Sequence, residues 1–296
     1  MPAQIIDGKQ IAKEMREEIR EEALRLTAAG HQPGLGVVLV GEDPASQSYV
    51  SAKEQACKEA GLYSDDNRLP ADVSEADLIA VVERLNADER IHGILVQLPL
   101  PAHINEGRIL LAIDPDKDVD GFHPMNVGKM LIGEKAFIPC TPHGVVQLLV
   151  RSGVTIAGSH VVVVGRSNIV GKPVAALLAR KHEHGNATVT LCHTGTKDIG
   201  SFTRQADIVI VAAGRPNTLT ADMIREGAVV IDVGVNRVTD ETRKRGYRLV
   251  GDVDYEPILE KASFVTPVPG GVGPMTITML LFNTLDAARM RAESQA

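Results

Sequence analysis

The chain has 296 residues, of which 44% are hydrophobic and 23% charged, which is enough apolar material for two globular domains. Its net charge of −7 argues against broad nucleic-acid binding, and no apolar run approaches the roughly 20 residues needed to span a bilayer. We therefore expect neither a nucleic-acid partner nor a membrane.

The N-terminus and the cysteines indicate the compartment. Residues 1–4 show no basic region followed by an apolar stretch, so we expect no signal peptide and a cytoplasmic location. The three cysteines, Cys57, Cys140 and Cys192, are odd in number and far apart, which suits a reducing compartment. Their spacing is not that of a zinc site, so we expect small buried side chains and no metal.

Helical and strand patterns alternate through the first half of the chain. In chain order, the pattern predicts a helix over 8–29, a strand over 36–40, helices over 44–60 and 74–86, a strand over 91–96, and helices over 104–112 and 142–152. Asp43 and Ser74 are the expected N-caps, and Pro44 suits the first helical position. This half is rich in βα units but lacks a glycine-rich phosphate loop.

Four apolar strands mark the second half, where helical segments separate them. They are expected over 161–164, 188–192, 208–212 and 229–233. Continuous β-branched runs are typical of strands buried on both faces of a parallel sheet, and βαβ alternation indicates a doubly wound fold. The sequence therefore predicts an α/β protein of two domains, a βα-rich N-terminal one and a Rossmann-like one, with a final helix over about 274–291.

The turn after the first of these strands is a candidate dinucleotide site. Gly165 ends the strand and Gly171 opens the next helix, whose N-terminus would direct N–H groups at a pyrophosphate. The spacing matches the usual G-x-G-x-x-G fingerprint only in part. A strand-to-helix turn without a ligand is the alternative.

Cofactor choice can be argued from the end of the second strand. Residues 192–196 contain no acid of the kind that binds the ribose 2′-hydroxyl of NAD. Arg166 and Ser167 are instead suited to a 2′-phosphate, so we favour NADP. His193 either lines that phosphate pocket or caps a strand.

The helix over 44–60 carries an unusual lysine. Lys53 lies within a stripe of small apolar residues, four positions after Tyr49 and on the same face. It either extends to water from the edge of the stripe or enters a cleft with a lowered pKa.

The most informative stretch is 269–277, Pro-Gly-Gly-Val-Gly-Pro-Met-Thr-Ile, whose glycines allow backbone to approach a ligand closely. A plain helix-entry loop is the alternative. This stretch is similar to a signature of the methylenetetrahydrofolate dehydrogenase/cyclohydrolase family. The chain resembles the same family at four more segments, Tyr-x-x-x-Lys at 49–53, Ile-Leu-Val-Gln-Leu-Pro-Leu at 94–100, Asp-Val-Asp-Gly-Phe at 118–122 and Gly-Arg-Ser at 165–167. The resemblance therefore covers essentially the whole chain.

The resemblance implies a bifunctional, NADP-dependent enzyme of one-carbon metabolism and purine biosynthesis. It would oxidise 5,10-methylenetetrahydrofolate and hydrolyse the methenyl product to the 10-formyl compound. The implied catalytic residues are Tyr49, Lys53, Gln97 and Asp120, which would also bind the folate together with Pro269, Gly270, Gly271 and Gly273. The implied cofactor-binding residues are Gly165, Arg166, Ser167, His193 and Val235, the last through its backbone.

The resemblance also implies a homodimer and a discontinuous folate-binding domain over 1–141 and 273–296, with the NADP-binding domain over 142–272. Three alternatives stay open: a dehydrogenase without cyclohydrolase activity, a shikimate-dehydrogenase-like oxidoreductase, and a nucleotide-binding regulatory protein without catalysis. The last of these gives no reason for the Tyr49/Lys53 pair.

Overall fold

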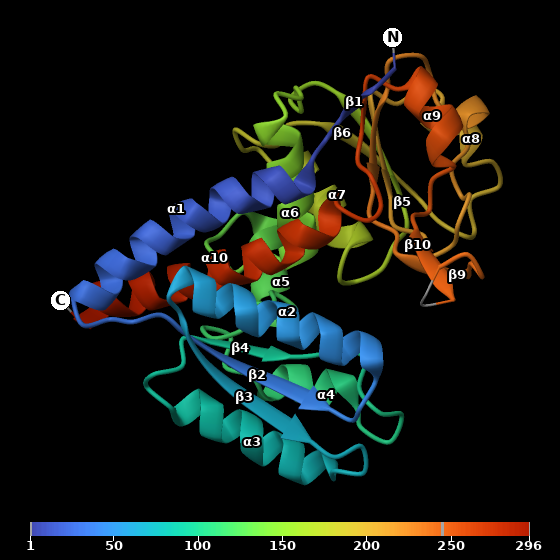
Figure 1. Ribbon diagram of the computed structural model, residues 1–296. Helices are drawn as coiled ribbons and strands as arrows, with labels where there is room; N and C mark the ends of the chain where they lie inside the picture. The colour runs from blue at the N-terminus through green and yellow to red at the C-terminus, as the bar shows by residue number, and fades with distance from the viewer. Residues whose placement is uncertain (1, 244–245, 296) are drawn as a thin grey trace. The chain divides into compact units, whose positions relative to one another are not determined.

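The computed structural model describes residues 2–243 and 246–295, which divide into two units (Figure 1). One unit holds the residues up to Ala12 together with Thr141–Thr276, and the other holds Lys13–Cys140 together with the chain from Ile277 onward. The first twelve residues were assigned to the other domain from the sequence, and that division into domains stays a prediction. In the folded chain β1 (Gln4–Ile5) pairs in parallel with β11 (Phe264–Val265).

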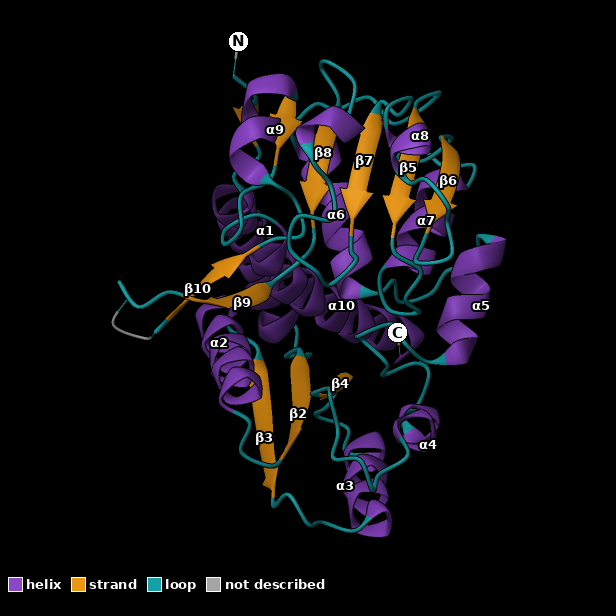
Figure 2. Ribbon diagram, turned by 90° about the vertical axis from the view of Figure 1, so that its right-hand side faces the viewer, coloured by secondary structure: helices purple, strands orange, loops and turns teal. Residues whose placement is uncertain are grey.

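A six-stranded parallel sheet forms the centre of the first unit. Figure 2 shows β8, β7, β5 and β6 side by side with their arrows pointing the same way. The strand order is β1-β11-β8-β7-β5-β6, with β5 (His160–Val164), β6 (Thr188–Cys192), β7 (Ile208–Val211) and β8 (Val229–Asp232). The strands β5, β7 and β8 are almost wholly buried, as their runs of valine and isoleucine predict. This confirms the doubly wound parallel sheet.

Helices and one hairpin complete the first unit. The helices are α6 (Cys140–Arg151), α7 (Gly171–Ala179), α8 (Gly200–Thr203), α9 (Tyr255–Lys261) and the single 3₁₀ turn η1 (Ala221–Met223). The hairpin pairs β9 (Asn236–Thr239) with β10 (Tyr247–Val250) in antiparallel register. A core of aliphatic side chains from β5, β7, β8 and α9 holds these elements together, with Val162, Val209, Val230 and Ile258 fully buried.

The second unit is built on a three-stranded parallel sheet of order β3-β2-β4. Its strands are β2 (Gly34–Val40), β3 (Tyr63–Leu69) and β4 (Gly93–Val96). Its helices are α2 (Pro44–Ala60), α3 (Glu75–Ala87), α4 (Glu106–Ala112) and α5 (Pro124–Ile132), with most of α1 (Gly8–Ala28) and α10 (Val272–Gln295). Figure 1 shows α2 on one side of the sheet and α3 on the other. Aliphatic side chains of α3 and α4 pack on β2 and β4.

Most predicted elements are present, with small differences at their ends. The predicted helix over 44–60 is confirmed to the residue, and Asp43 caps it as expected. The final helix begins at Val272, two residues before the proline expected to start it. The sequence did not predict strands β1, β3, β9, β10 and β11 or helix α5. Among the helices that the structure describes, none is long and apolar enough to cross a membrane.

Candidate active site

Helix α2 places Lys53 inside the protein. Asp43 accepts a hydrogen bond from the Ser46 N–H at 2.8 Å, and Gly61, with φ +77°, ends the helix in the left-handed conformation. These two signals set where the helix begins and ends. Lys53 is only 7% exposed, whereas Tyr49, one turn earlier, is 43% exposed. The lysine therefore does not extend to water, and burial lowers its pKa; that it lies in a ligand-binding cleft stays a prediction.

Gln97 receives the ammonium group of Lys53. The Lys53 Nζ donates to Gln97 Oε1 at 2.9 Å. Gln97 follows β4, and its backbone N–H donates to Val38 O of the neighbouring strand at 2.9 Å. Its side-chain Nε2 donates to Leu98 O at 2.7 Å, so the amide oxygen is turned toward the lysine. The end of β4 thus holds one acceptor in a fixed direction.

Asp120, whose charge acts on Lys53, lies in the segment between α4 and α5. Gly121 follows it with φ +74°, and a Cβ there would lie 2.5 Å from Pro139 N, so no other residue fits. Asp118 is 1% exposed and accepts N–H groups from Phe122 at 3.2 Å and His123 at 2.8 Å. These contacts fix the backbone on both sides of Asp120.

Burial and charge act against each other at Lys53 and Asp120. Burial lowers the pKa of Lys53, and the Asp120 carboxylate partly opposes this shift. Burial likewise raises the pKa of Asp120, and the Lys53 charge and the thiol of Cys140 oppose it. A lysine with a lowered pKa is more readily found as the neutral amine near physiological pH, which is the form able to accept a proton.

Two further polar residues of this unit were not predicted from the sequence. Cys140, fully buried, hydrogen-bonds Asp120 and also donates to Val119 O at 3.4 Å. Asn283 of α10, 3% exposed, donates to Val119 O at 2.8 Å and to Ile138 O at 3.0 Å. No local motif marks either residue. Asn283 contacts a segment more than a hundred residues away, and Cys140 contacts a segment that precedes it across α5.

The first unit carries the predicted dinucleotide turn between β5 and α7. Gly165 has φ +129°, and a Cβ there would lie 2.2 Å from Ala212 O. A Cβ on Gly171 would lie 2.0 Å from Gly165 O. The two glycines therefore bring the strand end and the helix N-terminus as close as backbone allows. This close approach of a strand end to a helix N-terminus fits a dinucleotide pyrophosphate.

Arg166, Ser167 and His193 lie beside this turn. Arg166 is exposed, and its Nη1 is 3.5 Å from His193 Nε2. The Ser167 hydroxyl accepts N–H groups of Val170 at 3.1 Å and Gly171 at 3.3 Å, so it also stabilises the start of α7. An arginine, a hydroxyl and an imidazole next to a helix N-terminus fit a ribose phosphate.

The remaining predicted residues also lie in the first unit, on loops and at the start of α10. Val235, 50% exposed, follows β8. Gly270 has φ +114°, and the Gly271 N–H donates to Pro267 O at 2.8 Å, which closes a tight turn before α10. Gly273 lies in the first turn of α10, where a Cβ would meet nothing within 4 Å. The structure thus groups Lys53, Gln97 and Asp120 in one unit, and the predicted nucleotide residues in the other.

A doubly wound unit with a dinucleotide turn, joined to an α/β unit with a buried lysine, defines a two-domain α/β dehydrogenase. Comparison with known proteins gives the particular family. Residues 6–120 match the catalytic domain of tetrahydrofolate dehydrogenase/cyclohydrolase, and residues 139–292 match the NAD(P)-binding domain of the same family. The chain belongs to the tetrahydrofolate dehydrogenase/cyclohydrolase family.

Individual relatives are similar over their whole length. The bifunctional protein FolD of Syntrophus aciditrophicus is 61% identical over 292 residues, which is 99% of each chain. The crystal structure of the bifunctional enzyme FolD from Campylobacter jejuni has a TM-score of 0.92 at 47% identity, covering 98% of this chain and 99% of that one. FolD of Trypanosoma brucei, complexed with NADP cofactor and an inhibitor, has a TM-score of 0.93 at 43% identity, covering 99% of each chain.

Proposed function

We propose that this protein oxidises 5,10-methylenetetrahydrofolate to the 5,10-methenyl compound with NADP+, and then hydrolyses that product to 10-formyltetrahydrofolate. The observation that carries the proposal is the buried Lys53, whose Nζ donates to Gln97 at 2.9 Å. The charge of the Asp120 carboxylate also acts on this lysine. A dehydrogenase alone needs no such base. Membership of a family of dehydrogenase/cyclohydrolases supports both reactions.

Asp120 and Tyr49 recognise the folate in this proposal. The Asp120 carboxylate, which accepts a hydrogen bond from Cys140, would present its oxygens to the amino and ring N–H groups of a pterin. Tyr49 is exposed enough to pack its ring on the folate ring system. Of the glycines that the family resemblance assigns to the folate, Gly273 leaves open space where a Cβ would be, whereas Gly270 and Gly271 are buried against the chain's own atoms.

The oxidation requires orientation more than acid or base. NADP+, when bound, supplies the acceptor for the hydride that leaves the methylene carbon. Gly165 and Gly171 allow the pyrophosphate to reach the α7 N-terminus, and Arg166, Ser167 and His193 hold the 2′-phosphate. The folate nitrogens stabilise the cationic methenyl product themselves, so no side chain has to move a proton.

The hydrolysis requires proton handling, which is assigned to Lys53. Water adds its oxygen to the methenyl carbon, and neutral Lys53 accepts the proton that this water loses. One carbon–nitrogen bond of the ring then breaks, and that nitrogen takes a proton to leave the 10-formyl product. The cationic substrate and the buried setting both disfavour the ammonium form of Lys53.

The test is an assay of the purified protein with 5,10-methylenetetrahydrofolate and NADP+ at neutral pH. NADPH and the 10-formyl product, with little methenyl compound accumulating, are the expected result. NADPH with persistent methenyl compound would favour the dehydrogenase-only alternative. No NADPH with NADP+ or NAD+ would overturn the proposal.

We further propose a homodimer in the cytoplasm that supplies one-carbon units to purine biosynthesis and binds neither membrane nor nucleic acid. Family resemblance supports the dimer, and the net charge of −7 fits the absence of nucleic acid. Light scattering after gel filtration tests the dimer, which would have twice the 31.7 kDa mass of one chain. A monomer at micromolar concentration would contradict it.

A further inference from the structure

A buried carboxylate with no assigned role lies beneath the loops that follow β7 and β8. Asp252 comes two residues after β10 and is 0% exposed. Its Oδ2 accepts N–H groups from Ala213 at 2.7 Å and Gly214 at 2.8 Å. These are the second and third residues beyond β7, so one carboxylate oxygen fixes the path of the chain where that strand ends.

The other oxygen of Asp252 fixes the neighbouring loop. Asn236 Nδ2 donates to Asp252 Oδ1 at 2.9 Å and to Gly251 O at 3.1 Å. A Cβ on Gly234 would lie 2.2 Å from Asp252 Cγ, so the backbone of this loop rests directly on the carboxylate. Val235 stands between these two residues and is half exposed.

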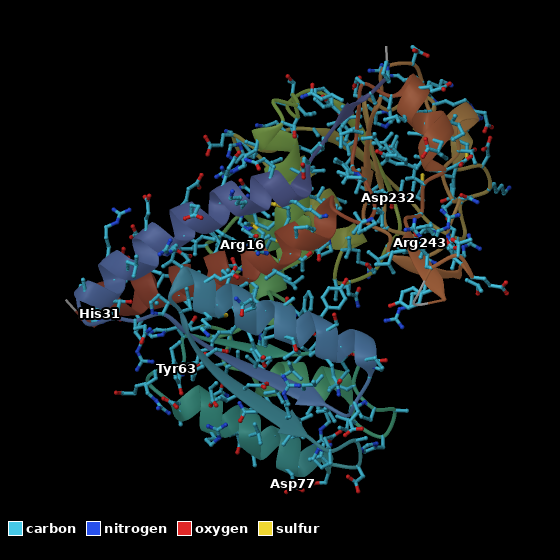
Figure 3. All side chains as sticks on the ribbon, viewed as in Figure 1. Arg16, His31, Tyr63, Asp77, Asp232 and Arg243 are labelled. Carbon is cyan, nitrogen blue, oxygen red and sulfur yellow. The ribbon has the colours of Figure 1, made fainter. Side chains whose placement is uncertain are left out.

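A second buried acid anchors the first. Asp232, 2% exposed, accepts N–H groups from Gly234 at 3.0 Å, Asp252 at 2.9 Å and Val253 at 3.0 Å. Figure 3 labels this residue, which ends β8. A Cβ on Gly251 would lie 1.7 Å from Asp232 Oδ2, so the segment can carry no side chain at that position. The backbone N–H of Asp252 is therefore held in place by β8 itself.

We propose that Asp252 is a positioning residue for the nicotinamide dinucleotide. The carboxyl ends of parallel strands are where doubly wound sheets bind ligands, and Asp252 sets the spacing of the 213–214 and 234–236 loops at two such ends. It touches neither substrate nor reacting atom and acts through Gly214 and Val235. The inference rests on the proposed function, because it needs NADP+ to be the ligand.

The test begins with Asp252→Asn, which keeps the shape of the side chain. The amide oxygen still accepts from Ala213 and Gly214, but its NH₂ group then faces the NH₂ group of Asn236, and two donors meet. We expect the Kd for NADP+, measured by calorimetry, and the KM for NADP+ to rise about tenfold or more. Hydrolysis of the methenyl compound, which uses Lys53 of the other unit, stays within about twofold of wild type.

A second change provides a rescue that a merely structural role would not show. Adding Asn236→Asp to Asp252→Asn restores an acceptor opposite the new amide and is expected to recover part of the NADP+ affinity, because the bond from Asn236 to Gly251 O is still lost. Asn236→Asp alone sets two carboxylates against each other and should weaken binding. Asp222→Asn is the matched control, an exposed acid of the same unit, and should leave the Kd unchanged.

The outcomes separate this inference from the proposed function. An unchanged Kd and KM in Asp252→Asn, or no recovery in the double variant, would overturn the role of Asp252. If Asp252→Asn does not fold, the milder Asn236→Ala provides the test. We expect its Kd for NADP+ to rise about threefold, and an unchanged Kd would overturn the role of Asp252. Wild-type protein that forms no NADPH would instead overturn the proposed function.

Discussion

Lys53 shows how one side chain is tuned by its surroundings. An ammonium group costs free energy to bury, and Gln97, its hydrogen-bond partner, carries no charge to offset that cost. Asp120 offsets part of it, so burial is the larger effect and the pKa falls. A neutral acceptor holds the amine in position without stabilising its protonated form, as a base at physiological pH requires.

The pH dependence of hydrolysis tests this account of Lys53. The neutral amine is the active form, so the rate should rise with pH and level off below the ordinary lysine pKa of about 10.4. Gln97→Glu places a negative charge at the same position and should move the inflection upward by about one pH unit or more. Rates of methenyl hydrolysis from pH 6 to 9, corrected for the spontaneous reaction, would measure both, and an inflection that Gln97→Glu leaves in place would contradict the assignment.

Asp118 should make the free energy of unfolding depend on pH. Burial raises its pKa to about 6, above the value of about 3.9 in an unfolded chain. The folded protein therefore binds more protons between pH 4 and 6, so the contribution of Asp118 to stability is full below pH 4 and is lost as the pH rises through 6. Two pKa units correspond to about 3 kcal/mol at most.

Asp118→Asn has no carboxyl group to titrate at this position. Comparing it with wild type therefore isolates the contribution of the Asp118 carboxyl. In urea unfolding at several pH values, the free energy of unfolding of wild type minus that of the variant should fall between pH 4 and 6. A difference that is independent of pH would show that the Asp118 carboxyl does not titrate in this range.

At the scale of elements, the turn between β5 and α7 depends on a glycine for two separate reasons. Gly165 has a positive φ, and its missing Cβ leaves room for Ala212 O at 2.2 Å. Gly227 also has a positive φ, +75°, but a Cβ there would meet no atom within 4 Å. Position 227 therefore requires glycine for its backbone conformation and not for close packing. Substitutions at Gly165 and Gly227 therefore distinguish the cost of a positive φ from the cost of a steric clash.

Gly227→Ala should lower the free energy of unfolding by about 1–2 kcal/mol, the usual cost of a left-handed alanine. Gly165→Ala should lower it further and weaken NADP+ binding about tenfold or more, because Ala212 must move. Urea unfolding and calorimetry of both variants measure this. Equal effects of the two substitutions on both quantities would contradict the account of the turn.

Elements with local signals could be predicted from the sequence. Helix α2 has Asp43, Pro44 and Gly61 at its ends, and β5 is a run of four valines after His160. Strand β3, Tyr-Ser-Asp-Asp-Asn-Arg-Leu, has no apolar pattern, since it is an edge strand held by pairing with β2. Its charges are used at the surface, where Arg68 pairs with Glu54 at 3.0 Å and with Asp66 at 2.7 Å.

The candidate site divides in the same way. Lys53 and Gly165 could be identified because an odd residue in a regular pattern is visible in the sequence itself. Asp232 and Asp252 could not, because an acid at a strand end or in a loop is unremarkable until folding buries it under backbone N–H groups. Residues that position others depend on contacts across the sheet, which periodicity does not encode.

At the scale of the whole molecule, the two proposed activities share the folate contacts of Tyr49 and Asp120 and differ in the other residues that they use. Lys53, Gln97 and Asp120 belong to one unit, and Gly165, Arg166, Asp252 and their partners belong to the other. Hydrolysis uses no nucleotide, and hydride transfer uses no base. Loss of one activity should therefore be possible without loss of the other, in either direction.

The most direct test of this account is Lys53→Met, assayed with 5,10-methylenetetrahydrofolate and NADP+ while NADPH, methenyl compound and 10-formyl product are followed together. The account predicts that NADPH still forms, that the methenyl compound accumulates, and that the 10-formyl product appears only at its spontaneous rate. Formation of 10-formyl product at the wild-type rate would contradict it.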